Sequence, residues 1–180
     1  FAVFPDRSDV PRNAARVLRY MDRYVLVTQG EVFYMTELLA KLEGLQRGPA
    51  GNTSLAAAFA LAREMNEDEI IVVNETEYTG AGKLPSAQLT FAKQNNIEVK
   101  RGDPIKEDKP GERIVIPESP LQIGYIEIPM IQLKESYINQ LFKRLNKTEF
   151  TKKEIEFIAE DIRESVGTVQ KLIEKLRDNF

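Results

Sequence analysis

The pattern of apolar and polar positions predicts alternating short strands and helices in the first part of the chain. Asp9, Val10 and Pro11 indicate a helix start, and an apolar stripe at helical spacing reaches Met21. Residues 24–28 (YVLVT) form a β-rich run. Thr28 has the capping-box spacing to Glu31, which predicts a helix that ends at Gly44. The buried face of that helix is expected to comprise Val32, Met35, Leu39 and Leu42.

The middle of the chain continues this alternation. An alanine-rich helix is predicted from residue 52, capped by Asn52, Thr53 or Ser54. Residues 70–73 (IIVV) are four consecutive β-branched residues without alternation, which predicts a strand covered on both faces, as in a parallel sheet. A helix from about Leu84 follows, and then strands within 97–104 and 113–119. This order is typical of an α/β layer fold.

The last third of the chain is predicted to be helical, so we divide the chain into an α/β segment (1–130) and a helical extension (131–180). Capping residues at Thr151 and Ser165 begin the last two helices. The apolar faces of the three helices comprise Leu133, Tyr137, Leu141 and Leu145, then Ile155, Ile158 and Ile162, and finally Val169, Leu172, Ile173 and Leu176.

Composition removes several classes of function. The chain of 180 residues has no histidine, cysteine or tryptophan. A Cys/His metal site, a disulfide framework and a Ser-His-Asp or Cys-His nucleophile are therefore excluded within it. The net charge is −3 and no apolar run approaches a membrane span, so we expect a cytoplasmic protein. The chain starts at Phe1 in a stretch that reads like the interior of a longer protein.

Two segments could carry chemistry. In residues 48–58 (GPAGNTSLAAA), small residues and the amides of a helix start could accept a carboxylate or phosphate, although tight packing of a capped helix explains the same residues. Residues 74–83 (NETEYTGAGK) follow the predicted strand 70–73, and ligands of open α/β sheets bind beyond the carboxyl ends of strands. Solvated carboxylates in a glycine turn are the alternative there. Lys41 and Lys83 are not favoured as reactive lysines, because isolated lysines are usually solvated.

The paired helices from Thr151 have the rhythm of a helix-turn-helix DNA reader. Residues 151–180 contain six Lys/Arg against seven Asp/Glu, whereas a module that contacts phosphates should be clearly positive. Packing of this helical hairpin on a neighbouring domain or subunit is the favoured interpretation.

These segments together resemble a known enzyme family. The helix 30–44, the GPAGNTSLAAA segment, the IIVV run and its polar turn are similar to the distal half of fold-type II (tryptophan-synthase-beta-like) pyridoxal-phosphate enzymes. Within that group, GNTSLAAAFALA, NETEYTGAGKLPSAQLTFAKQNNIEVKRGDP and IPESPLQI resemble the beta subunits of 2-amino-4-oxopentanoate thiolases. The resemblance extends from about Pro5 to Leu176 and covers the C-terminal part of such a subunit.

The resemblance implies a fold and a site. The fold would be part of a three-layer domain with a parallel sheet, followed by a helical tail. The turn after the IIVV run would face the cofactor ring, with Thr76 as the hydroxyl at the ring nitrogen and Asn74 and Glu75 as alternatives. The same cleft would be bordered by Gly51, Asn52 and Thr53. The lysine that forms a Schiff base with the cofactor would lie upstream of this chain.

The resemblance also implies an activity and partners. With pyridoxal 5'-phosphate, the enzyme would be an acyltransferase (thiolase) that cleaves 2-amino-4-oxopentanoate with coenzyme A to acetyl-CoA and alanine, in ornithine degradation. A small alpha subunit and homo-oligomerisation are expected. Alternatives are another lyase or β-replacement enzyme of the same fold type, and an α/β regulator with a helix-turn-helix tail.

Overall fold

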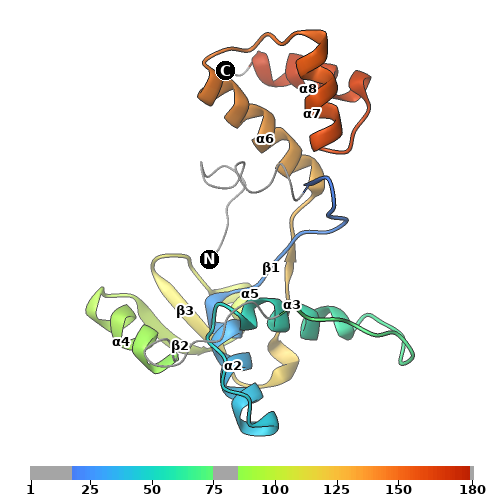
Figure 1. Cartoon of the computed structure of the whole chain (residues 1–180). Helices are drawn as coiled ribbons and strands as arrows, with labels where there is room; N and C mark the ends of the chain where they lie inside the picture. The colour runs from blue at the N-terminus through green and yellow to red at the C-terminus, as the bar shows by residue number, and fades with distance from the viewer. Residues whose placement is uncertain (1–17, 75–84, 179–180) are drawn as a thin grey trace. The chain divides into compact units, whose positions relative to one another are not determined.

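The structure is a computed structural model that describes residues 18–74 and 85–178 (Figure 1). These residues form two compact units. One comprises residues 25–126 and combines helices with small sheets, and the other comprises the described residues 18–24 and 127–178 and is helical. We describe each unit by itself. The N-terminal helix predicted from Asp9 lies almost entirely outside the described residues.

The first helix of the α/β unit, α2 (Gln29–Glu43), begins and ends as predicted. The Thr28 side chain accepts from the Glu31 amide, the Glu31 carboxylate accepts from the Thr28 amide, and Gly44 ends the helix with a φ of 66°. Val32 and Met35 are buried as expected. The expectation for Leu42 is wrong: its side chain is 71% exposed, because the last turn extends beyond the core.

The second helix, α3 (Asn52–Ala62), packs on α2 through the fully buried Ala56 and the nearly buried Ala60. The predicted side-chain cap is wrong. Gly51 occupies the cap position, and no side chain accepts a capping hydrogen bond there. The physical reason is that Asn52 is drawn into the interior, as described below.

The strand predicted at residues 70–73 is absent as a paired element. The segment belongs to no strand of the described chain, and Ile70 and Val72 are 86% and 90% exposed. A strand requires a neighbouring backbone to accept and donate its hydrogen bonds, and the described residues provide none at this position.

The other predicted strands are confirmed. β2 (Glu98–Gly102) and β3 (Arg113–Pro117) pair in parallel, in a register that runs from Glu98 opposite Arg113 to Gly102 opposite Pro117. The short helix α5 (Pro104–Glu107) lies in their connection, α4 (Pro85–Gln94) precedes β2, and α2 packs on β3. Two short strands, β1 (Val25–Leu26) and β4 (Ile126–Glu127), form a second sheet.

The helical unit contains α6 (Met130–Leu145), α7 (Lys152–Asp161) and α8 (Val166–Arg177). Both predicted caps are present at Thr151 and Ser165. The core contains the predicted faces of α7 and α8 almost completely, and adds Leu18, Ile138 and Phe142. On α6 the expected face ends before Leu145, which is 52% exposed.

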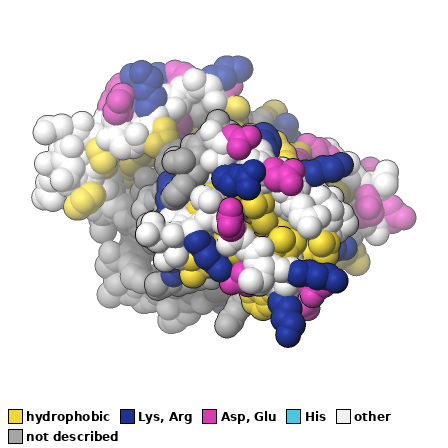
Figure 2. Space-filling model, turned by 90° about the horizontal axis from the view of Figure 1, so that it is seen from above, with side chains coloured by type: hydrophobic (Ala, Val, Ile, Leu, Met, Phe, Trp, Pro, Cys, Tyr) yellow, Lys and Arg dark blue, Asp and Glu magenta, His cyan; other side chains and the backbone are white. Residues whose placement is uncertain are grey.

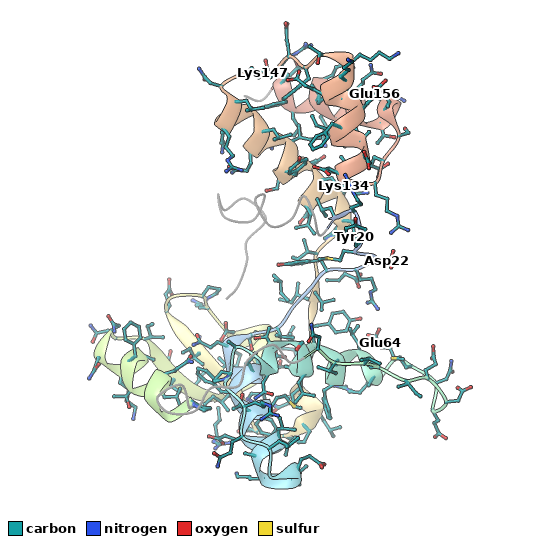
Figure 3. The ribbon with its side chains drawn as sticks, in the orientation of Figure 1. Tyr20, Asp22, Glu64, Lys134, Lys147 and Glu156 are labelled. Carbon is teal, nitrogen blue, oxygen red and sulfur yellow. The ribbon has the colours of Figure 1, made fainter. Side chains whose placement is uncertain are left out.

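Ion pairs surround this core. Lys147 bonds Glu154 at 2.6 Å, and this bond and the capping box at Thr151 lower the pKa of Glu154 to about 2. In Figure 3, Lys147 is labelled at the end of α6 and Lys134 near its start. Arg19 bonds Asp161 at 2.5 Å, and the hydroxyl of Tyr137 donates to the other oxygen of that carboxylate at 3.2 Å. Ion pairs at the surface of a protein contribute modestly to its stability.

Candidate functional site

Four of the six predicted site residues lie within the described part of the chain. Gly51, Asn52 and Thr53 form the start of α3, and Asn74 ends the extended segment that follows this helix. Thr76 and Glu75 lie outside the described residues. The roles of all six therefore stay predictions, and the structure determines the surroundings of the first four.

Asn52 is a buried polar contact between two helices. Its side chain is 0% exposed, and its Nδ2 donates to Oγ1 of Thr36 on α2 over 3.0 Å. The Thr36 hydroxyl in turn donates its proton to the carbonyl of Val32 at 2.7 Å. The Asn52 Oδ1 atom is buried and has no hydrogen-bond partner among the residues that the structure describes. Asn52 thus fixes the start of α3 on α2 and leaves one buried acceptor unsatisfied.

The backbone amides at the start of α3 are engaged within the chain. The Asn52 amide donates to the Gly48 carbonyl at 3.2 Å, and the Thr53 amide donates to the Ala50 carbonyl at 3.4 Å. The Thr53 hydroxyl donates to the carbonyl oxygen of Pro49 at 3.4 Å. These two amides are therefore occupied by the preceding turn, so they do not form the anion cradle that the spacing suggested.

Ser54 brings the two candidate segments together. Its hydroxyl lies 3.0 Å from the carbonyl oxygen of Gly51 and 3.0 Å from that of Asn74. A serine hydroxyl has one proton, so these two oxygens share a single donor. Because of this contact, Asn74 lies beside the first turn of α3. The sequence suggested Ser54 only as a helix cap, and gave no signal for this contact with a segment 20 residues later.

Glu31 is a buried acidic residue that caps α2 as the sequence predicted, and it makes a further contact that the sequence did not indicate. Its side chain is 0% exposed, and its carboxylate accepts from the amides of Thr28 at 2.6 Å and Gly124 at 2.7 Å. Burial raises the pKa of the Glu31 carboxyl above its usual range, although the two amides act in the opposite direction. The distant bond to Gly124 shows that this cap also holds a loop 93 residues away.

A shallow pocket lies at the opposite end of α3. It is lined by Ala60, Arg63, Glu64, Ile123, Gly124 and Tyr125. Arg63 donates to the carbonyl oxygen of Ile123 at 2.7 Å, and the Tyr125 hydroxyl donates to Glu64, which is labelled at the end of α3 in Figure 3, at 2.6 Å. With a rise of about 1.5 Å per residue, the two ends of α3 are on the order of 16 Å apart, so this pocket is separate from the predicted cleft.

Among residues 18–74 and 85–178, no cluster of acidic side chains is arranged to hold a metal ion. Within the same residues, no helix is both long enough and apolar enough to cross a membrane.

The helical hairpin α7–α8 does not have the charge distribution of a DNA reader. Arg163, whose φ of 54° marks the turn between the helices, bonds Asp22 at 2.9 Å. Lys134 bonds Glu164 at 2.6 Å, so basic side chains at this turn are used within the unit. On the face drawn in Figure 2, basic and acidic side chains of the described residues are interspersed. Phosphate binding requires an uncompensated positive surface, so these observations favour a structural role.

Comparison with known proteins gives two strong matches. The chain is 60% identical over 176 residues to a protein named 2-amino-4-ketopentanoate thiolase beta subunit from an unidentified prokaryote. It is 51% identical over 177 residues to a protein of the same name from Acetoanaerobium sticklandii. Each match covers 98% of this chain, but only 37% and 38% of the two relatives. The chain thus spans little more than a third of the length of these curated relatives.

These identities confirm the resemblance seen in the sequence: the chain is homologous, over nearly its whole length, to a part of such thiolase subunits. No protein-family model matches the chain, and no solved structure matches it significantly.

Proposed function

We propose that this chain is part of the beta subunit of a thiolase that cleaves 2-amino-4-ketopentanoate with coenzyme A, giving acetyl-CoA and alanine. The observation that carries the proposal is the 60% and 51% identity to proteins of that name over 98% of the chain. The word "subunit" in those names supports a second, alpha subunit as partner. Ornithine degradation is the pathway that we assign to this activity.

The proposed cofactor is pyridoxal 5'-phosphate, held in part by the start of α3 and the turn from Asn74. One observation supports the fit: Gly51 and Asn74, two of the predicted cofactor-binding residues, both have their carbonyl oxygens within 3.0 Å of the hydroxyl of Ser54, so the helix start and Asn74 lie side by side. When bound, this cofactor supplies the electron sink that stabilises a carbanion.

The residues of this chain would orient the cofactor rather than react with it. Thr76 is the proposed hydroxyl at the ring nitrogen, with Asn74 and Glu75 as alternatives, and Gly51, Asn52 and Thr53 border the cleft. A neutral hydroxyl does not hold the ring nitrogen protonated, so it moderates the electron sink. The lysine that carries the cofactor is expected in the polypeptide outside this chain, and coenzyme A supplies the thiol that the chain lacks.

The proposal is tested on the complete subunit, together with its alpha subunit. We expect a cofactor absorbance band in the visible range and release of acetyl-CoA that depends on coenzyme A. Thr76→Val should shift the band, whereas Thr148→Val, in the helical unit, should leave it unchanged. A complete protein with neither the band nor the activity contradicts the proposal. An unchanged band and rate in Thr76→Val moves the hydroxyl assignment to another residue of the turn.

The alternative enzyme class is a lyase or β-replacement enzyme of the same fold type. It differs from the thiolase in a way that one assay detects, because such an enzyme turns over amino acids without coenzyme A. Substrate profiling with and without coenzyme A therefore separates the two. The regulator alternative predicts binding to duplex DNA at moderate salt, which the paired charges of the helical unit disfavour.

A further inference from the structure

An extended apolar segment of the α/β unit is presented to solvent. The side chains of Ile70 and Val72 are 86% and 90% exposed, and Ile71 and Val73 between and after them are half-buried. Successive side chains of an extended segment point to opposite sides, so one side faces solvent completely and the other is only partly covered. Scattered apolar residues on a surface are ordinary, but four consecutive β-branched residues are not.

Both ends of this segment are fixed by hydrogen bonds. At its start, a turn is closed by the Glu69 amide, which donates to the Asn66 carbonyl at 3.1 Å, while the Glu69 carboxylate accepts from the Asn66 amide at 2.7 Å. At its end, the Asn74 carbonyl accepts from Ser54. Between them, no backbone hydrogen bond joins residues 70–73 to another described residue. The segment therefore has no hydrogen-bonded neighbouring backbone among the described residues.

An unpaired strand of this composition is a liability in water. Its amides and carbonyls form a template for another chain, and proteins usually protect such an edge with charges, proline or a covering element. Residues 70–73 contain no charged residue and no proline. A run that is apolar on both sides is suited to a strand with neighbours on both edges and layers on both faces.

We propose that residues 70–73 form an internal strand of a parallel sheet, and that its neighbouring strand comes from the part of the same, longer polypeptide that the relatives have and this chain lacks. The chain matches only 37% and 38% of those relatives, so most of such a polypeptide lies beyond the match. The proposal rests on this difference in length and on the exposed segment, and it is independent of the reaction proposed above.

The parallel arrangement favours this occupant over a second copy of the chain. Two copies related by a two-fold axis would pair the same strand with itself in antiparallel fashion. Parallel neighbours are instead joined by a crossover within one polypeptide, as are β2 and β3 in this unit. Continuous apolar runs without alternation are typical of parallel strands.

The test is hydrogen exchange of the complete subunit, resolved for the amides of residues 71–73. We expect their exchange to be at least 100-fold slower than that of unprotected peptide. The amides of β2 provide the protected reference, and those of the exposed segment 45–46 provide the unprotected one. Protection should be the same at every protein concentration and should not require the alpha subunit.

A pair of substitutions at Val72 in the complete subunit gives a second measurement. Val72→Pro removes the amide and should lower the melting temperature by more than 10 °C, whereas Val72→Ile keeps the amide and the apolar β-branched side chain and should change it much less. Unprotected amides in the complete subunit overturn the proposal. Protection that disappears on dilution to the monomer, or that appears only with the alpha subunit, also overturns it and assigns the edge to a second copy or to that subunit.

Discussion

Gly30 is the position at which one added carbon atom tests the packing of the α/β unit. It is the second residue of α2, and a Cβ atom there would lie 1.8 Å from the carbonyl oxygen of Val115 in β3 and 2.5 Å from its carbonyl carbon. Ordinary contact begins at 3.4 Å, and the obstacle is backbone, which cannot rotate away as a side chain could. Overpacking of this kind costs about 1–3 kcal/mol and occasionally more, so we expect Gly30→Ala to lower the free energy of unfolding of this unit by at least about 3 kcal/mol.

The helical unit provides a matched control. Gly167 is also the second residue of its helix, α8, and a Cβ atom there would meet only the Ser165 hydroxyl, at 4.0 Å. Alanine is favoured over glycine in a helix by about 0.5–1 kcal/mol, so Gly167→Ala should stabilise the helical unit slightly. The same substitution at the same helical position is thus expected to have opposite signs in the two units.

Urea unfolding measures both effects. Because the two units need not unfold together, hydrogen exchange of peptides from β3 and from α8 should report which unit responds. Gly30→Ala should accelerate exchange in β3 and leave α8 unchanged. If Gly30→Ala stabilised the protein, or if both variants changed stability by the same amount, the close approach of α2 to β3 would be refuted.

Three further predictions concern buried and capping groups. Glu31→Gln keeps one acceptor but turns an amide donor toward either the Thr28 amide or the Gly124 amide. It should therefore lower the free energy of unfolding in urea by about 1–3 kcal/mol, and an unchanged free energy would contradict the double cap. The pKa of Glu154 is lowered to about 2, so the stability that this carboxylate contributes is present above about pH 4.5 and is lost as the pH falls toward 2. Acid unfolding of Glu154→Gln should lack this dependence. The same pH dependence of unfolding in the variant and in the unchanged protein would contradict the prediction. Thr36→Val removes the hydroxyl that accepts from the buried Asn52 side-chain amide, so it should lower the free energy of unfolding, measured by thermal unfolding, by about 1–3 kcal/mol. Thr36→Ser keeps this hydroxyl and should retain most of that stability.

Local signals in the sequence predicted the helix ends well. The capping boxes at Thr28 and Thr151, the cap at Ser165 and the stop at Gly44 depend on residues within one turn of each other, so spacing alone identifies them. The apolar face of α8 was predicted completely for the same reason. The strands β2 and β3 were also predicted, but their parallel pairing with each other was not.

Contacts between segments far apart in the chain could not be predicted in this way. Asparagine is a common helix cap, but the side chain of Asn52 bonds Thr36 on another helix in the interior, and Gly51 occupies the cap position instead. The apolar run 70–73 indicates an environment buried on both sides, whereas the described chain leaves its outer side in water. The apolar pattern of a segment indicates the environment for which that segment is suited. The neighbouring strand or layer that provides this environment need not lie in the same 180 residues.

Three polar side chains of the α/β unit, of which Glu31 and Asn52 are fully buried, hold backbone segments in place. Glu31 joins the start of α2 to Gly124, Asn52 joins α3 to α2, and Ser54 joins α3 to Asn74. Each of these bonds fixes a loop or helix end that apolar packing alone would leave free to shift, because hydrophobic contact is not directional.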